Sequence, residues 1–223
     1  YQPYKQLPLP PPLPKQATSI VSLSICSQDR YLVIGESDSS ISFWRLSNNE
    51  AIFIYSCRDA VELPSRRPHS PFFVEMRRAC VCVSATRKLC FSSDSRPQIR
   101  VWDLVRLPPP VGQPKKVVLN NHREGITDMC LGGSNDDFLL SCSLDDNVCI
   151  WDLRGSHIQL VRVIFNKEAS LVRGCVSLCA SSDGKIVYAG GSAGTVWVTE
   201  AIVEAMPRTR HKAGVSCVLT SPD

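Results

Sequence analysis

The chain has 223 residues, of which 43% are hydrophobic and 21% are charged, as is usual for a globular protein with a sizeable core. Its formal net charge is +4, which is too small to indicate nucleic-acid binding by itself, because dedicated binders concentrate far more positive charge on one face. No apolar run reaches the roughly 18 residues that a membrane-spanning helix needs, and no signal-peptide pattern is present. We therefore expect neither a membrane protein nor a secreted one.

The chain opens with a proline-dense segment, residues 1–16. Proline removes backbone donors and favours an extended polyproline helix, so we expect a tail rather than a strand. Lys5, Pro8 and Pro11 fit the Lys-x-x-Pro-x-x-Pro pattern of ligands for proline-recognising domains. The alternative is a surface leader that has no such partner.

After this tail, one unit recurs four times. It consists of a short apolar strand, a turn, a second strand, a turn of small residues, and a strand that ends near tryptophan. The clearest copy is residues 138–154, FLLSCSLDDNVCIWDLR. The aligned tryptophans are Trp44, Trp102 and Trp151, whereas the fourth copy has Thr199 at this position and Trp197 two residues earlier.

Histidines mark the same period. His122 and His211 each open a His-x-x-Gly-[Ile/Val]-[Thr/Ser] pattern, and they are 89 residues apart, or two repeats of about 44. Strand-rich repeats of roughly 40–45 residues that end in Trp-Asp are typical of WD-repeat proteins. From about Ser19 to Asp223, the chain resembles the WD-repeat β-propeller family.

This resemblance implies an all-β fold with about four four-stranded blades. A single blade cannot bury both of its faces, but blades stacked around an axis cover one another. Because seven blades are common in this family, we expect the four to be part of a seven-bladed ring within a longer protein. The expected blades span about 17–59, 79–122, 123–168 and 169–211, and a further blade starts at 212–223.

A long segment, residues 60–78, separates the first two blades. Long surface loops on rigid scaffolds often carry binding residues. We expect this segment to be either a plain inter-blade loop or a basic loop that contacts a partner. The partner would be a protein or, as an alternative, RNA or DNA. Its candidate contact residues are Arg66, Arg67, Arg77 and Arg78.

The strongest constellation is structural and follows from the resemblance. In the family, a buried hydrogen-bond network links a histidine, a serine or threonine, an aspartate and the blade's tryptophan. The matching residues here are His122, Ser143, Asp145 and Trp151. A catalytic triad is the alternative, but a nucleophile must be exposed in a cleft with an oxyanion hole, and we find no Gly-x-Ser-x-Gly motif accompanied by an acid and a base.

We predict no catalytic, cofactor or metal site. Cys80 and Cys82 lack the CxxC spacing of a zinc knuckle. The chain has 11 cysteines, about half the density that signals a disulfide scaffold. Most of them lie in apolar strand-like runs, where free cysteine packs as a small hydrophobe. We therefore expect an intracellular protein, in the cytoplasm or the nucleus.

One motif indicates a partner. Residues 139–154 resemble the WD box of substrate receptors that dock on the adaptors of cullin-RING ubiquitin ligases, and Arg154 is the residue that adds to the ordinary repeat. Our main hypothesis is a non-catalytic protein-interaction scaffold, a subunit of a multiprotein or ribonucleoprotein assembly. The alternatives are such a substrate receptor and a nucleic-acid-binding module that uses basic loops.

Overall fold

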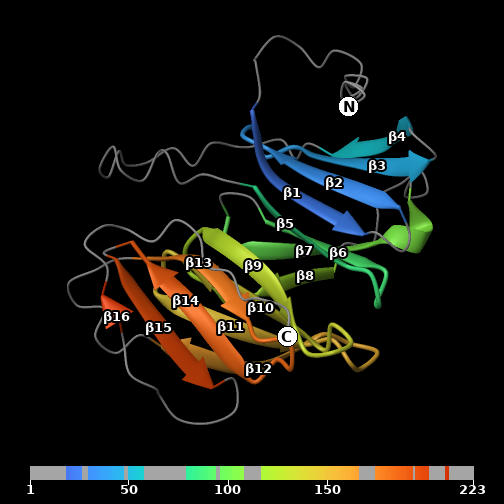
Figure 1. Cartoon of the computed structure of the whole chain (residues 1–223). Helices are drawn as coiled ribbons and strands as arrows, with labels where there is room; N and C mark the ends of the chain where they lie inside the picture. Colours follow the sequence, from blue (N-terminus) through green and yellow to red (C-terminus); the bar gives the residue numbers. More distant parts are fainter. Residues whose placement is uncertain are drawn as a thin grey trace, which may run out of the picture.

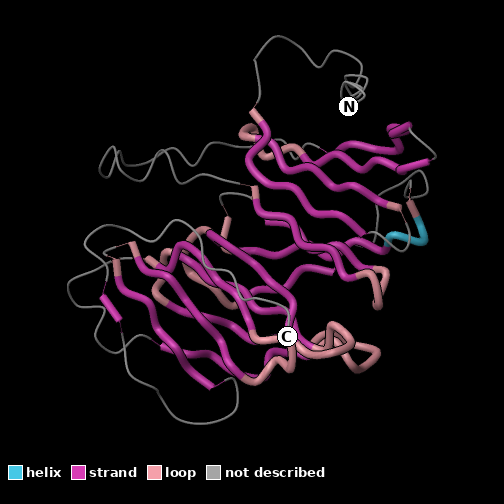
Figure 2. The backbone as a smooth tube through the Cα atoms, in the orientation of Figure 1, coloured by secondary structure: helices cyan, strands magenta, loops and turns pink. Residues whose placement is uncertain are grey.

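The structure is a computed structural model of the chain, and it describes residues 19–26, 30–47, 50–57, 79–93, 96–107, 117–165, 174–192, 194–200 and 209–210. Within these residues the fold is built of β-strands, joined by turns and one 3-10 helix, η1 at Leu104–Arg106 (Figures 1 and 2). The proline-rich tail, the loop 60–78 and the segment 212–223 lie outside the described residues.

The described strands form four antiparallel sheets of four strands each, and within a sheet the strands follow one another in chain order. The first sheet contains β1 (Ile20–Cys26), β2 (Tyr31–Glu36), β3 (Ile41–Ser47) and β4 (Glu50–Cys57). The second contains β5 (Cys80–Ser84), β6 (Leu89–Ser93), β7 (Gln98–Asp103) and β8 (Val117–Asn120). The third contains β9 (Ile126–Gly132), β10 (Phe138–Ser143), β11 (Asn147–Asp152) and β12 (Gln159–Phe165). The fourth contains β13 (Cys175–Ala180), β14 (Ile186–Gly191), β15 (Thr195–Glu200) and β16 (Thr209–Arg210).

The four sheets stack in chain order, with the first and the fourth at opposite ends of the stack (Figure 1). Their first strands are neighbours, β1 beside β5, β5 beside β9 and β9 beside β13. Side chains form hydrogen bonds across the contacts between neighbouring sheets, which we call seams. Ser24 accepts a hydrogen bond from the backbone N–H of Val83 at 3.1 Å, and Asp128 accepts one from Leu178 at 2.8 Å. The prediction of an all-β propeller fold with four four-stranded blades is confirmed.

The three aligned tryptophans occupy equivalent places. Trp44 pairs with Leu32, Trp102 with Cys90, and Trp151 with Leu139. In each sheet the partner is the second residue of the second strand. We call the face that carries the tryptophan, or Thr199 in the fourth sheet, the tryptophan face, and the opposite one the back face.

The tryptophan face of one sheet packs on the back face of the sheet before it. The indole of Trp102 lies 5.4 Å from the ring of Phe43, measured between ring centroids. Trp151 belongs to the core cluster that contains Phe91 and Ile99 of the second sheet. Burial of such side chains contributes about 1.5–3 kcal/mol each, so these seams hold the stack together.

Turns reinforce the seams. The guanidinium of Arg87, after β5, donates to Asp137 at 2.7 Å, and the hydroxyl of Ser84 donates to Asp136 at 2.8 Å. Where the third and fourth sheets meet, two backbone segments approach closely instead. Gly184, in the turn after β13, has a φ of +69°, and a Cβ there would lie 2.5 Å from the backbone nitrogen of Gly133. Only glycine fits at this position.

Replacing Gly184 with alanine should therefore destabilise the fold by more than about 1 kcal/mol, because the substitution adds both a backbone clash and a left-handed φ. Urea denaturation followed by circular dichroism measures this loss. Gly155→Ala is the matched control, since the nearest atom to a Cβ at that residue is 3.5 Å away. Equal stability of the two variants would contradict the seam described here.

Candidate functional site

The candidate site lies in the third sheet and joins four buried side chains. Trp151 comes from β11 and Ser141 from β10, while His122 precedes β9 and Asp145 lies in the turn between β10 and β11. The indole N–H of Trp151 donates to Ser141 Oγ at 3.0 Å. The Nε2 atom of His122 lies 2.9 Å from the same oxygen, and its Nδ1 atom lies 3.3 Å from the Asp145 carboxylate.

The structure therefore brings together His122, Asp145 and Trp151 of the predicted network, but its serine is Ser141. The prediction of Ser143 at this place is wrong. Ser143 donates to the carbonyl of Glu124 at 3.0 Å instead. Ser143 is two residues further along β10 than Ser141, or about 6.6 Å at the rise of a strand, which takes it away from the indole.

A spacing in the sequence points to the correct serine. In the second sheet the indole N–H of Trp102 donates to Ser92 Oγ at 2.7 Å. Ser92 precedes Trp102 by ten residues, as Ser141 precedes Trp151. The first sheet lacks a serine ten residues before its tryptophan, and the Trp44 indole donates to Ser42 in its own strand at 3.1 Å.

Hydrogen bonds determine the protonation states of His122 and Asp145. Burial disfavours the charged imidazole, but hydrogen bonds to Asp145 and Cys149 outweigh it and raise the pKa of His122 from 6.5 to about 9. Burial also opposes ionisation of Asp145, but hydrogen bonds from His122 and from the backbone of Arg123 lower the pKa of this carboxyl. At neutral pH the two side chains form a buried ion pair.

The network is suited to holding the blade together, not to attacking a substrate. Ser141 is completely buried and accepts hydrogen bonds from Trp151 and His122, which uses both of its lone pairs. A nucleophile has to reach its substrate in a cleft. A satisfied buried network instead makes the surrounding sheet rigid.

Arg154 is exposed, with 58% of its side chain accessible, yet it is held in place. Its Nε and Nη2 atoms donate to the two oxygens of Asp152 at 2.9 and 2.7 Å, and its guanidinium stacks 4.9 Å from the centroid of the Phe138 ring. Hydrogen bonds from Arg154 lower the pKa of Asp152 to about 2. The other predicted contact residues, Arg66, Arg67, Arg77 and Arg78, lie outside the described residues.

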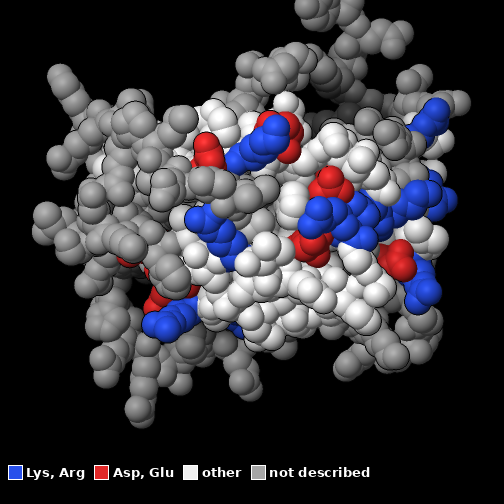
Figure 3. All heavy atoms as spheres, turned by 90° about the horizontal axis from the view of Figure 1, so that it is seen from below, with Lys and Arg blue, Asp and Glu red and all other residues white. Residues whose placement is uncertain are grey.

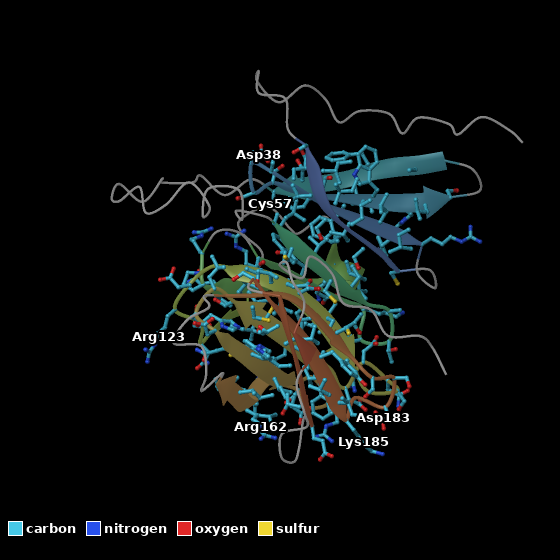
Figure 4. The ribbon with its side chains drawn as sticks, turned by 60° about the vertical axis from the view of Figure 1, so that its left-hand side comes forward. Asp38, Cys57, Arg123, Arg162, Asp183 and Lys185 are labelled. Carbon is cyan, nitrogen blue, oxygen red and sulfur yellow. The ribbon has the colours of Figure 1, made fainter. Side chains whose placement is uncertain are left out.

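Charges of both signs are interspersed on one face of the described residues. On the face that Figure 3 shows, Lys and Arg side chains lie beside Asp and Glu side chains. At the turn after β13, Lys185 and Asp183 lie side by side, 3.3 Å apart (Figure 4). The described residues therefore form no single-sign basic patch on this face.

The ten described cysteines are all free thiols, and burial raises the pKa of the Cys82 thiol to about 12. In the described part of the chain, no three His, Cys, Asp or Glu side chains lie close enough to hold a metal ion. No helix in that part is long and apolar enough to cross a membrane.

Truncation of Trp151 to alanine should cost about 3–5 kcal/mol of unfolding free energy, because it opens a cavity between the second and third sheets and leaves Ser141 without the indole donor. Differential scanning calorimetry gives the loss. Trp197→Ala provides the comparison, since Trp197 pairs with Ala189 and is only partly buried. A melting temperature unchanged by Trp151→Ala would contradict the structural role.

Stability should also depend on pH through His122. Because the pKa of His122 is higher in the folded chain than its ordinary 6.5, the stabilisation is complete below about pH 6.5 and is lost as the pH rises through about 9. The increase of the His122 pKa from 6.5 to about 9 corresponds to a loss of unfolding free energy on the order of 3 kcal/mol at alkaline pH. Asp145 has the opposite pH dependence, because its pKa is lowered from the ordinary value of 3.8 in the folded chain. The stability that Asp145 contributes is therefore lost when the pH falls below about 3.8.

Urea titrations between pH 6 and 9.5 measure the alkaline limb. His122→Gln should remove this pH dependence, while Ser42→Ala, in the first sheet, should leave it intact. An alkaline limb of the same size in wild type and in His122→Gln would show that another group causes it.

Comparison with known proteins agrees with this geometry. The family model described as "WD domain, G-beta repeat" matches residues 112–152, which include His122, Ser141, Asp145 and Trp151. A search of the curated proteins finds no match to the chain. The matched repeat and the four stacked four-stranded sheets together fit the WD-repeat β-propeller family.

Proposed function

We propose that the chain is a non-catalytic interaction scaffold, a subunit of a multiprotein or ribonucleoprotein assembly. WD repeats generally serve as platforms for binding other proteins. The observation that carries the proposal is the buried network, in which the polar side chains of His122, Ser141 and Asp145 bond to one another and to Trp151. This chemistry fixes the fold and leaves recognition to the surface.

The architecture supports this role. Hydrogen bonds and ion pairs across the seams, such as Ser24 with Val83 and Arg87 with Asp137, hold the sheets in fixed positions. A rigid frame lowers the entropy lost on binding, because the turns that meet a partner are already placed. The free thiols fit the reducing interior of a cell, where we place the protein, in the cytoplasm or the nucleus.

Affinity purification of the full chain, followed by native mass spectrometry, tests the scaffold role. We expect at least one protein partner in stoichiometric amount. Charge reversal at a turn, Lys185→Glu or Arg123→Glu, should weaken the association at least tenfold in one case and leave it intact in the other. Arg123 precedes the first strand of its sheet and Lys185 precedes the second strand of its sheet, so the two lie at opposite edges of the sheets, and a partner that docks at one edge meets only one of them.

Recovery of the wild-type chain without any stoichiometric partner would contradict the scaffold role. Equally, a hydrolase or transferase activity that disappears with Ser141→Ala, in a variant that still folds, would contradict the absence of catalysis. Ser92→Ala is the control for folding effects, because Ser92 has the same indole contact in the second sheet.

Docking on a ubiquitin-ligase adaptor is a second candidate, and one observation favours it. Arg154 is exposed while Asp152 and Phe138 fix its guanidinium in one position. A cation held in this way loses little side-chain entropy when it meets a partner's carboxylate. The nucleic-acid alternative lacks a comparable observation, because its arginines lie outside the described residues.

A pull-down with the purified adaptor tests this candidate. The wild-type chain should bind, and Arg154→Ala should reduce binding at least tenfold, whereas Arg162→Ala, on β12, should bind like wild type. Failure of the wild-type chain to bind, or equal binding by Arg154→Ala, would exclude the substrate-receptor role.

A further inference from the structure

We propose that Cys142 and Cys175 are a disulfide-forming site that joins the third sheet to the fourth, with a low-molecular-weight disulfide such as oxidised glutathione as the oxidant. In the structure both residues are free thiols, so the site is described in its reduced state. The inference concerns the contact between two sheets and is independent of the partners that the scaffold binds.

The two cysteines come from neighbouring sheets. Cys142 lies on β10, Cys175 is the first residue of β13, and these two strands are in contact. Both side chains are completely buried. They belong to one apolar cluster that also contains Leu140 of the third sheet and Val187 of the fourth. The seam between these sheets therefore encloses two thiols, one from each side.

Thr127, on β9, links the two cysteines. Its hydroxyl donates to the backbone carbonyl of Cys175 at 2.5 Å and lies 3.3 Å from the Sγ atom of Cys142. The side chains of Cys142 and Cys175 are also in hydrogen-bonding contact with each other. A disulfide requires two sulfur atoms about 2 Å apart, so the bond needs a local adjustment of two side chains that already touch.

The reaction is a thiol–disulfide exchange in two steps. The thiolate of one cysteine attacks a sulfur atom of oxidised glutathione, which releases one glutathione thiolate and leaves a mixed disulfide. The thiolate of the other cysteine then attacks the protein sulfur of the mixed disulfide and releases the second glutathione thiolate. The protein loses two protons and two electrons, and one molecule of oxidised glutathione becomes two molecules of the reduced form.

Burial decides when this exchange occurs. The thiolate is the reactive form of cysteine, and burial raises the pKa of the Cys142 thiol well above its ordinary value. The closed seam protects the reduced pair, because it excludes the oxidant and disfavours the thiolate. Opening of the seam exposes both thiols, and their proximity then favours one disulfide within the protein over two mixed disulfides.

The disulfide changes how the third and fourth sheets are held together. In the reduced chain they are joined by noncovalent contacts, such as the hydrogen bond from the backbone N–H of Leu178 to Asp128. A covalent bond between Cys142 and Cys175 closes a loop that contains β11 and β12, which lowers the entropy of the unfolded chain. The oxidised chain is therefore harder to unfold, and reduction by a thiol reverses the change.

Refolding of the full chain tests the site, because the unfolded chain exposes every thiol to the oxidant. The chain is unfolded in urea and refolded in a buffer of reduced and oxidised glutathione, and the remaining thiols are then alkylated. Peptide mapping without reductant should recover the peptides of Cys142 and Cys175 as a disulfide-linked pair. Cys90→Ala is the matched control, because Cys90 is also completely buried but lies in the second sheet; this variant should keep the linked pair.

Urea denaturation measures the effect of the bond on the fold. Oxidised wild type should unfold at a higher urea concentration than the reduced chain. Cys175→Ala should unfold at the same urea concentration before and after oxidation, because it lacks one of the two sulfur atoms. Cys142→Ser is the second variant, and circular dichroism checks that each variant folds.

Several results would overturn the inference. One is the absence of the linked pair after refolding of wild type in oxidised glutathione, and another is an equal yield of linkages among the other cysteines. A stabilisation by oxidation that persists in both Cys175→Ala and Cys142→Ser would assign the effect to other thiols. Equal stability of oxidised and reduced wild type would contradict a bond that holds the two sheets together.

Discussion

The packing of a tryptophan face on the back face of the preceding sheet is the interaction on which this structure depends. A four-stranded sheet has two sides, and in this chain both sides carry large apolar residues, such as Phe43 on one and Trp44 on the other. Stacking on the second sheet buries the Phe43 side, whereas Trp44, on the other side, is buried in a cluster of its own sheet. The close approach of Trp102 to Phe43, at 5.4 Å between ring centroids, shows how the second sheet meets this requirement of the first.

Once the seams exist, polar groups at the edges become buried and need partners. The network of His122, Ser141, Asp145 and Trp151 satisfies this need in the third sheet. The second sheet keeps the serine and the indole, and the first keeps only the indole, which turns to Ser42. The sheets therefore share one packing geometry, while their polar networks differ in completeness.

The repeat and its tryptophans were sufficient to predict the fold, because the register of a hairpin follows from its apolar pattern. Trp44, Trp102 and Trp151 accordingly occupy equivalent positions. The serine of the network was not predicted correctly, since Ser141 and Ser143 both lie on β10 and only the pairing of β10 with β11 decides which one the indole reaches. The total of seven blades remains a prediction.

Partner recognition could not be predicted to the same degree, because it depends on surface contacts and not on the repeat. The stacking of Arg154 on Phe138 is one such feature, since it requires the side chain of β10 to meet a residue that follows β11. Solution NMR tests the central claim most directly. Nuclear Overhauser effects should link the Trp102 indole to the Phe43 ring, which belongs to a different sheet. Contacts of that indole with residues of its own sheet alone would contradict the stacked arrangement.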